Sequence, residues 1–396
     1  MIRTTPFHER VAALDHTGLW SHWAGYLVAD KYQLSEKFEY FAIRNSAGIF
    51  DTSPLYKYRI QGPDAERFLA GVLARDIATC RIGRAQYTIW CDDDGYLIED
   101  GVILRLAGDE FLLSAARPNL AYLSALTRGM AVEIVDESEA WAAIAVQGPR
   151  SREILDGVAP DIGGLGYFQL TTTKIADAGV IVSRTGFTGD LGYEVWVPAE
   201  RALPVWDAVM EAGIPAGLIP FGQIALSMAR IEAGLPLIDV DFTSARFAWT
   251  PAQKTTPVEL GLGWMVSDLD RPFIGRDAIR REIERASSRH RFTGLVVDWQ
   301  EWDDLFDAAG LIPPKDHAPV EADRMLYDDE GAVVGWASSS MYSPMLQRHI
   351  GLARVRPDLA EPGNRVNLEV TIDHRHHTVG AVVTPLPLFH PDRRTA

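Results

Sequence analysis

The chain has 396 residues with 47% hydrophobic and 23% charged side chains, an ordinary composition for a globular protein of two or three domains. Its 38 basic and 54 acidic residues leave a net charge of −16. This balance argues against a nucleic-acid partner, because a surface that neutralises phosphates needs clustered positive charge.

Cysteine usage and hydropathy indicate the cellular compartment in which the protein is expected. Cys80 and Cys91 form neither a disulfide framework nor a CxxC pair. No apolar run approaches the roughly 18 residues of a membrane span, and the N-terminus lacks the apolar core of a signal peptide. We therefore expect a cytoplasmic protein with no membrane partner.

The first 50 residues carry helical patterning and many aromatic side chains. The residues alone leave open whether these rings pack in the core or line a pocket. Residues 58–65 then read as a strand, a turn and the start of a helix over 65–73. Asp64 is the expected N-cap, because its carboxylate can accept a free amide of the first helical turn.

A hairpin is predicted around Asp92–Gly95, because Asp-Gly suits a turn that needs positive φ. Its strands cover 86–91 and 96–104. Alternation along the second strand places Leu97, Glu99 and Gly101 on one face and Ile98, Asp100 and Val102 on the other. Since burying an unpaired charge is costly, Asp100 is paired, hydrogen-bonded or functional, and the residues alone do not decide between these.

Two Gln-Gly-Pro segments, at 58–63 and 141–149, each read as a strand that runs into a helix. Their similarity suggests an internal duplication. The repeated unit is a strand plus a helix, which is typical of an α+β domain.

A Gly-rich stretch, Arg184–Glu194, joins apolar runs at 178–183 and 195–198 and reads as strand, turn and strand. Three glycines in seven residues indicate backbone at positive φ, or a close approach of the backbone to another group. Arg184 is expected to pair locally.

The end of the chain is predicted to be rich in strands. A charged helix over 280–290 reads as a solvated connector. The histidines His374, His376 and His377 fall at a hairpin tip, so we expect no metal site there. Strands are expected near 293–299, 323–328, 332–338, 365–371 and 376–383.

Three ordered stretches carry a family resemblance. Arg184–Glu194 resembles the R-T-G-Y-T-G-E-D-G-Y-E signature of the glycine-cleavage T-protein (aminomethyltransferase) family. Residues 217–236 resemble its L-R-L-E-A-G segment, and 261–264 followed by 273–276 resemble its G-L-G-W and F-I-G-R pair. The resemblance implies an α+β, three-lobed, tetrahydrofolate-binding fold: an N-terminal lobe (1–140), a second lobe (141–280) and a C-terminal β-barrel-like domain (281–396).

The same resemblance implies a site in the central cleft. The family's catalytic Asp falls on Asp100, and its pterin-binding carboxylate falls on Glu194, since two adjacent N–H donors match one bidentate acceptor. Tyr167 and Phe168 correspond to aromatics beside the pterin ring. The cofactor-binding residues are thus Glu194, Tyr167, Phe168, Phe187, Ser114 and Arg230, although the residues leave open a scaffold role for Arg230.

Three positions depart from the family pattern, and the first two favour its tetrahydrofolate-dependent demethylase branch. Residues 44–53 resemble R-x-x-A-G-L-F-D-V-S, but Pro54-Leu55 follows where the family has His-Met. Ala115-Ala116 stands near the family's usual Asn, and Leu226 stands where the family often has Arg.

The resemblance leads to a main hypothesis and two alternatives. The first is a methyltransferase that moves a methyl group from a small methylated substrate to N5 of tetrahydrofolate, with a cationic donor held by Trp23, Tyr26, Tyr56 and Tyr58. Tyr56, Tyr58 and His22 are the candidates for any general acid. The alternatives are an aminomethyltransferase of glycine cleavage, which needs a lipoylated carrier protein, and a non-catalytic folate-binding protein, whose K-G-C-Y-x-G-Q-E motif is missing here.

Overall fold

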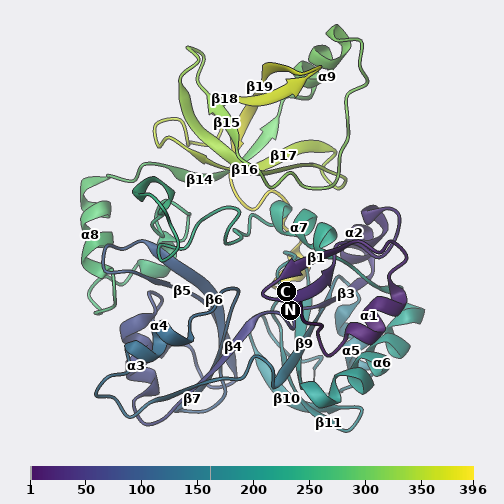
Figure 1. Ribbon diagram of the computed structural model, residues 1–396, viewed down its shortest axis with the longest axis vertical. Helices are drawn as coiled ribbons and strands as arrows, with labels where there is room; N and C mark the ends of the chain where they lie inside the picture. Colours follow the sequence, from purple (N-terminus) through teal and green to yellow (C-terminus); the bar gives the residue numbers. More distant parts are fainter. Residues whose placement is uncertain (1, 161) are drawn as a thin grey trace.

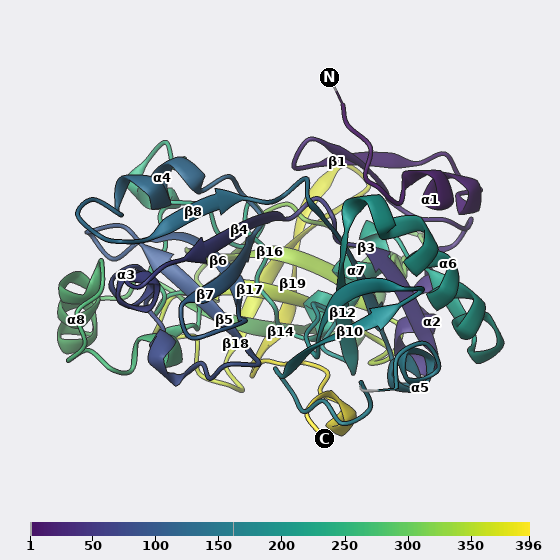
Figure 2. The same ribbon diagram turned by 90° about the horizontal axis from the view of Figure 1, so that it is seen from below.

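Two sheets and a closed barrel organise the computed structural model, which describes residues 2–160 and 162–396 (Figure 1). The barrel stands at the top of Figure 1, and two α+β lobes lie side by side below it. The chain ends overlap in that view but lie on opposite sides of the molecule in Figure 2. The α+β fold with a C-terminal barrel, expected from the sequence, is confirmed.

The first lobe is a five-stranded sheet with the order β5-β6-β7-β4-β8. One face packs on two helices through an apolar core that includes Tyr58, Trp90 and Phe111. Helix α3 joins this core because Phe68 and Leu69 lie on its inner face. The elements are β4 (Tyr56–Gln61), α3 (Ala65–Val72), β5 (Arg84–Cys91), β6 (Leu97–Arg105), β7 (Glu110–Ala115), α4 (Leu120–Ala125) and β8 (Glu133–Asp136).

The second lobe is a six-stranded sheet with the order β10-β11-β12-β9-β3-β13. Its core includes Ile144, Val195 and Trp206. An N-terminal hairpin of β1 and β2 lies beside it (Figure 2). The elements are α1 (His8–Leu14), β1 (Trp20–Trp23), β2 (Tyr26–Ala29), α2 (Glu36–Asn45), β3 (Ala47–Asp51), β9 (Trp141–Gln147), α5 (Ser151–Asp156), β10 (Leu170–Ile175), β11 (Ala178–Ser183), β12 (Gly192–Pro198), α6 (Ala202–Gly213), β13 (Leu218–Pro220) and α7 (Gln223–Glu232).

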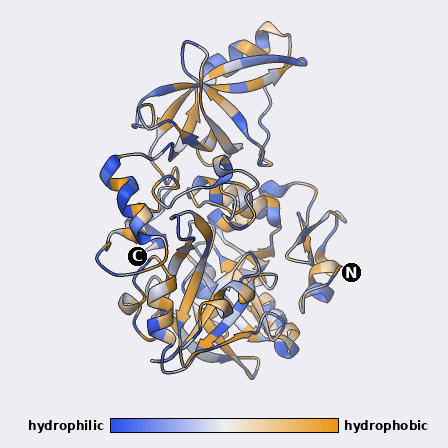
Figure 3. Ribbon diagram, turned by 60° about the vertical axis from the view of Figure 1, so that its left-hand side comes forward, coloured by the Kyte–Doolittle hydropathy of each residue, from blue (hydrophilic) through white to orange (hydrophobic). Residues whose placement is uncertain are grey.

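The two sheets meet face to face. Ala85 and Leu104 of the first sheet pack with Ile181 and Trp196 of the second. In Figure 3 the strands of both lower lobes carry long hydrophobic stretches, drawn in orange. The contact brings the sheet faces that carry Asp100 and Glu194 towards a common space.

The structure divides the chain differently from the boundaries expected at 140 and 280. Strand β3 lies between β9 and β13, so the first fifty residues complete the second lobe. Conversely, Leu260 and Phe273 pack against Ile89 of the first lobe. The two lobes are therefore interleaved in sequence, which linear composition does not reveal.

The expected duplication is visible in the topology. Strand β4 leads into α3, and β9 leads into α5 in the same way. Gly62 and Gly148, which end the two strands, have φ of 126° and 127°. A Cβ at Gly148 would lie 2.7 Å from the Ser46 carbonyl oxygen, so backbone conformation and space both require glycine there.

The C-terminal domain is a closed barrel with the order β14-β17-β16-β15-β18-β19. The five expected strands are present, and the structure adds a sixth, β17, which pairs with both β14 and β16 and thereby closes the sheet. The charged connector is α8. The elements are α8 (Arg276–Arg285), β14 (Arg291–Val297), α9 (Trp299–Ala308), β15 (Arg324–Tyr327), β16 (Val333–Ser343), β17 (Arg348–Val355), β18 (Arg365–Ile372) and β19 (Arg375–Thr384).

Two local expectations near the N-terminus are wrong. The helical patterning of the first 50 residues yields helices only at α1 and α2, and β1–β2 form a hairpin because Ala24 and Gly25 both adopt positive φ. Asp64 stands at the N-cap position of α3, but its carboxylate accepts the Ala131 amide at 2.7 Å instead of a first-turn amide.

The face alternation of β6 is correct for Glu99 and Asp100 but wrong at its beginning. A bulge leaves Ile98 unpaired, because Leu97 pairs with Cys91 and Glu99 pairs with Trp90. Ile98 therefore packs in the first-lobe core, whereas Leu97 turns to the opposite side of the sheet.

A buried ionic network joins the lobes to the barrel. Arg44 on α2 donates to Glu232 on α7 at 2.7 Å and to Asp190 in the Gly-rich loop at 3.3 Å. All three side chains are fully buried. Ser343, at the end of β16, donates to Glu232 at 2.5 Å, and Arg393 near the C-terminus donates to Asp190 at 2.7 Å.

Among the described residues, no helix has both the length and the apolar character that crossing a bilayer requires.

The substitution Arg44→Met should lower the free energy of unfolding by about 3–5 kcal/mol, because it leaves two buried carboxylates without their shared partner. Chemical denaturation followed by intrinsic fluorescence measures this change. Arg291→Met, which removes an exposed ion pair with Glu361, is the control and should shift the midpoint little. Equal midpoints for the two variants would show that Arg44 stabilises the fold no more than an exposed ion pair does.

Candidate active site

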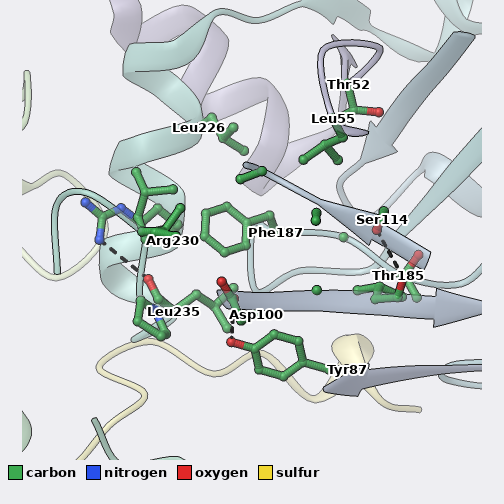
Figure 4. Close-up of a pocket in the computed structure, with 18 of the residues that line it drawn as sticks. Thr52, Leu55, Tyr87, Asp100, Ser114, Thr185, Phe187, Leu226, Arg230 and Leu235 are labelled. Atoms are coloured by element: carbon green, nitrogen blue, oxygen red, sulfur yellow. Dashed lines mark hydrogen bonds between the residues drawn. The ribbon is translucent and has the colours of Figure 1, made fainter. Parts of the chain in front are cut away.

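A cavity of about 1890 Å³ lies where the two sheets, the N-terminal hairpin, α7 and the barrel meet. Its walls come from segments far apart in sequence, among them β6, β12, the Gly-rich loop and the C-terminal tail. Figure 4 shows part of it, with Asp100 and Thr185 contributed by different lobes. The expected residues that line it are Asp100, Glu194, Tyr167, Phe168, Phe187, Ser114, Arg230, Trp23 and Tyr56.

Asp100 presents a carboxylate to this cavity from β6. Its Oδ2 accepts the hydroxyl of Tyr87, on the neighbouring strand, at 2.8 Å. Burial raises the pKa of Asp100 to about 6, and the Tyr87 bond opposes this rise. Among the described residues no cation lies within ion-pair distance, so Asp100 is a hydrogen-bonded group and not half of a structural ion pair.

Glu99 occupies the other face of β6, in the first-lobe interior. It accepts the amides of Ala116 and Arg117 at 2.8 and 3.0 Å and the Asn119 side chain at 2.8 Å. Burial and the nearby Asp100 charge raise the pKa of Glu99 to about 8. Its role is to hold the turn after β7, whose residues 115–118 form part of the cavity wall.

Glu194 presents the second carboxylate from β12. Its Oε2 accepts the hydroxyl of Thr185, which in turn lies 2.7 Å from the hydroxyl of Ser183. Burial raises the pKa of Glu194. We find no hydrogen bond to Oε1 within residues 2–160 and 162–396, so this oxygen is available to a ligand in the cavity.

The Gly-rich loop is shaped around one side chain, Gln147 of β9. A Cβ at Gly186 or Gly192 would lie about 2 Å from the Gln147 amide oxygen, at 2.1 and 2.2 Å respectively. Gln147 binds the loop carbonyl of Thr185 and accepts the Thr188 hydroxyl at 2.8 Å. Gly186 and Gly192 therefore allow a close approach, whereas Gly189 adopts a positive φ of 70°, so both interpretations of the glycines apply within this loop.

The three aromatic residues expected to bind the cofactor lie in two parts of the cavity. Tyr167 and Phe168 meet edge to face with ring centroids 4.7 Å apart, and the Arg394 guanidinium lies 5.9 Å from the Tyr167 ring. Phe187 lies in the central part with Leu226, as Figure 4 shows. Flat apolar faces at these positions suit a planar heterocycle.

Ser114 and Arg230 line the cavity, but their polar groups are engaged with the protein. The Ser114 hydroxyl donates to the Val102 carbonyl at 3.1 Å. Arg230 donates to Asp241 at 2.5 Å and to Glu321 and Ser339 at 2.8 Å each. These contacts favour the scaffold role that the sequence left open for Arg230.

The four aromatics expected to hold a donor do not form one cage. Trp23 and Tyr56 line the cavity. Tyr58 instead is fully buried in the first-lobe core, where its hydroxyl accepts the Asn119 amide at 2.8 Å. Tyr26 is buried beneath Arg3, whose guanidinium lies 4.2 Å from its ring. Tyr26 and Tyr58 are therefore corrected to structural residues, and Tyr58 is no longer a candidate acid; His22 does line the cavity.

Sequence reasoning missed several residues of the site. Tyr87 faces Asp100 only through strand pairing, where Ile89 opposes Asp100 and Tyr87 opposes Val102. Arg184 does not pair locally: besides the Leu165 carbonyl it holds the backbone of the last residues, with a 2.6 Å bond to the Ala396 carbonyl. The alternation of side chains along β5 was the only sequence signal that could have indicated Tyr87. No sequence signal indicated that the C-terminal residues lie at the site.

Comparisons with known proteins agree with this geometry. A family model described as the GCVT N-terminal domain matches residues 7–269, and one described as the glycine cleavage T-protein C-terminal barrel domain matches residues 308–390. An aminomethyltransferase of Halothermothrix orenii is 32% identical over 355 residues, covering 89% of this chain and 90% of the relative.

Two further similarities bear on fold and chemistry. The trimethylamine-oxide aldolase of Ruegeria pomeroyi is 32% identical over 408 residues, covering 99% of this chain but 48% of that longer relative. The crystal structure of the glycine cleavage system aminomethyltransferase T from Bartonella henselae superposes with a TM-score of 0.81 at 22% identity, covering 98% of each chain. The latter supports the fold.

Removing the Tyr87 hydroxyl should raise the pKa of Asp100 by about one unit, because burial is then opposed by one hydrogen bond fewer. The variant is Tyr87→Phe, and a carboxyl ¹³C NMR titration measures the change. Tyr96→Phe, on the same hairpin, is the control. An Asp100 titration that is the same in Tyr87→Phe and wild type would show that the contact does not set this pKa.

Proposed function

Since the chain belongs to the glycine-cleavage T-protein (aminomethyltransferase) family, we propose that it is a tetrahydrofolate-dependent one-carbon transferase acting on an aminomethyl donor. The observation that carries the proposal is the pair of half-buried carboxylates, Asp100 and Glu194, that face one cavity from two different sheets. Under this proposal the donor is an aminomethyl-loaded lipoylated carrier protein, the partner that the sequence analysis gave as its alternative.

The residues of the cavity fit tetrahydrofolate. Glu194 has an oxygen free for adjacent N–H donors, and Thr185 fixes the orientation of the carboxylate. Tyr167, Phe168 and Phe187 offer ring faces and edges to a flat heterocycle. Tetrahydrofolate supplies the amine nitrogens that receive the one-carbon unit.

Asp100 serves proton transfer in this proposal. With a pKa near 6 it is mostly ionised at neutral pH yet close enough to neutrality to accept a proton. Tyr87 binds Oδ2 and so holds the carboxylate plane, which leaves Oδ1 to take the proton. Glu194, the second carboxylate, lies on a separate strand, and in this proposal it orients the bound folate ring.

Demethylation of a small methylated substrate is the second candidate. Leu55 and Leu226 line the cavity where the family pattern has Met and often Arg, and Figure 4 shows both directed into the same space as Phe187. This apolar wall suits a methylated donor, and the similarity to a trimethylamine-oxide aldolase points the same way. Because more of the similar relatives are named aminomethyltransferases, we rank this candidate second. A non-catalytic folate-binding role gains no support, because Asp100 is present and faces the cavity.

Incubation with tetrahydrofolate and an aminomethyl-loaded lipoylated carrier should yield 5,10-methylenetetrahydrofolate, measured by chromatography. A parallel panel of sulfonium, betaine, N-methyl and aryl methyl ether donors tests the second candidate, whose product is 5-methyltetrahydrofolate. Product from the carrier alone supports the proposal. Product from a methylated donor alone would replace it with demethylation, and folate binding without any product would favour a non-catalytic role.

Asp100→Asn should lower turnover by at least about 100-fold while leaving the folate dissociation constant nearly unchanged, because the amide cannot accept the proton. The exposed hairpin residue Asp93 provides the matched control, Asp93→Asn. Turnover that survives in Asp100→Asn would remove Asp100 from the mechanism.

Glu194→Gln should weaken folate binding by about 10- to 100-fold, because a charged hydrogen-bond acceptor is lost. Isothermal calorimetry with 5-methyltetrahydrofolate measures the dissociation constant, and Glu200→Gln, at an exposed position in the turn that follows the same strand, is the control. An unchanged constant in Glu194→Gln would place the heterocycle elsewhere in the cavity.

A further inference from the structure

One fully buried lysine lies behind the cavity wall and has no part in the chemistry described above. Lys57, on β4, is 0% exposed. Its Nζ donates to the carbonyls of Ser53 and Leu55 at 2.8 and 2.7 Å and lies 5.8 Å from the ring of Trp196, on β12 of the other lobe. Among the described residues no carboxylate lies within ion-pair distance of this ammonium.

The two carbonyls belong to the connection between the lobes. Residues 52–56 run from β3 of the second sheet to β4 of the first, and Thr52, Leu55 and Tyr56 line the cavity. This connection also carries the Pro54-Leu55 departure from the family pattern. By binding alternate carbonyls, Lys57 holds the turn that directs Leu55 into the cavity, as seen in Figure 4.

The charge of Lys57 is balanced at longer range by three carboxylates from three different strands, whereas β7 places the neutral Ser114 opposite it. These are Asp51 on β3, Asp136 on β8 and Glu194 on β12. Burial lowers the pKa of Lys57 to about 7, and the carboxylates oppose that fall. In turn, burial raises the pKa of Glu194, and the Lys57 charge counteracts it.

We propose that Lys57 is a positioning residue: its buried ammonium both fixes the wall formed by residues 52–56 and stabilises the ionised Glu194 that receives the folate ring. The second half of this statement rests on the proposed function, because it takes Glu194 as the folate carboxylate. Lys57 touches neither substrate, since it does not line the cavity.

A ligand that binds at Glu194 should change the pKa of Lys57 in one direction. A ligand over Glu194 displaces water, so the carboxylate charge acts on Lys57 with less screening. Lys57 is already fully buried, so its own desolvation does not change. Ligand binding therefore raises the pKa of Lys57, and by linkage the ligand binds more tightly when Lys57 is protonated. The affinity is then high at pH values below the pKa that Lys57 has in the ligand-free protein, and it falls as the pH rises through that pKa.

The first test measures the dissociation constant of 5-methyltetrahydrofolate between pH 6 and pH 9 in wild type, Lys57→Met and the control Lys174→Met, an exposed lysine on β10. A pKa rise of about one unit predicts that wild-type affinity falls about tenfold over this range. The same fall is expected in Lys174→Met and none in Lys57→Met. Combining Lys57→Met with Glu194→Gln should give a coupling of at least about threefold.

The second test leaves Lys57 itself in place. The chain has six lysines, so ¹⁵N-lysine labelling of the wild type allows the Lys57 Nζ resonance to be titrated with and without 5-methyltetrahydrofolate. We expect the pKa of Lys57 to rise on binding in wild type and to stay unchanged in Glu194→Gln. Binding with an unmoved Lys57 titration would overturn the assignment of Lys57 alone. Failure of wild type to bind the folate would overturn the proposed function and this inference together.

Discussion

The arrangement of the three lobes depends on the buried guanidinium of Arg44. It bridges Glu232 and Asp190, and these two carboxylates hold the barrel through Ser343 and the C-terminal tail through Arg393. A buried charge is stable only when its partners are in place, so the network specifies one arrangement of the segments that meet there. The cavity lies at this junction, which means that folding and the shape of the site are determined by the same contacts.

The charges that face the cavity are organised differently from those in the network. Asp100 and Glu194 are bonded to hydroxyls, from Tyr87 and Thr185, and have no cation in contact among the described residues. Each carboxylate therefore keeps a raised pKa and acceptor capacity that an ion pair would remove. The structure thus separates the ion pairs that hold the lobes together from the carboxylates that face the cavity.

Leu55 and Leu226 line a part of the cavity that departs from the family pattern, so membership of the family does not by itself identify the substrate. Asp100 and Glu194 lie in stretches whose sequences resemble the family motifs, and the similar relatives are chiefly named aminomethyltransferases. Leu55 and Leu226, by contrast, place apolar side chains where the pattern has other residues. These two side chains lie on the connection between the lobes and on α7, outside the sheets that carry the carboxylates, so they can vary without changing the strands.

The sequence by itself determined the family, the α+β class, the β5–β6 hairpin and the duplicated strand-to-helix units, because these depend on local periodicity, turn residues and short motifs. It also singled out Asp100 and Glu194, each within a single motif, and both line the cavity. Only the tertiary structure decided that the first fifty residues complete the second lobe, that Tyr58 is a core residue, and that Tyr87, Lys57 and the C-terminal tail support the site. Those features arise from contacts between residues tens to hundreds of positions apart, for which one sequence carries no periodic or compositional signal.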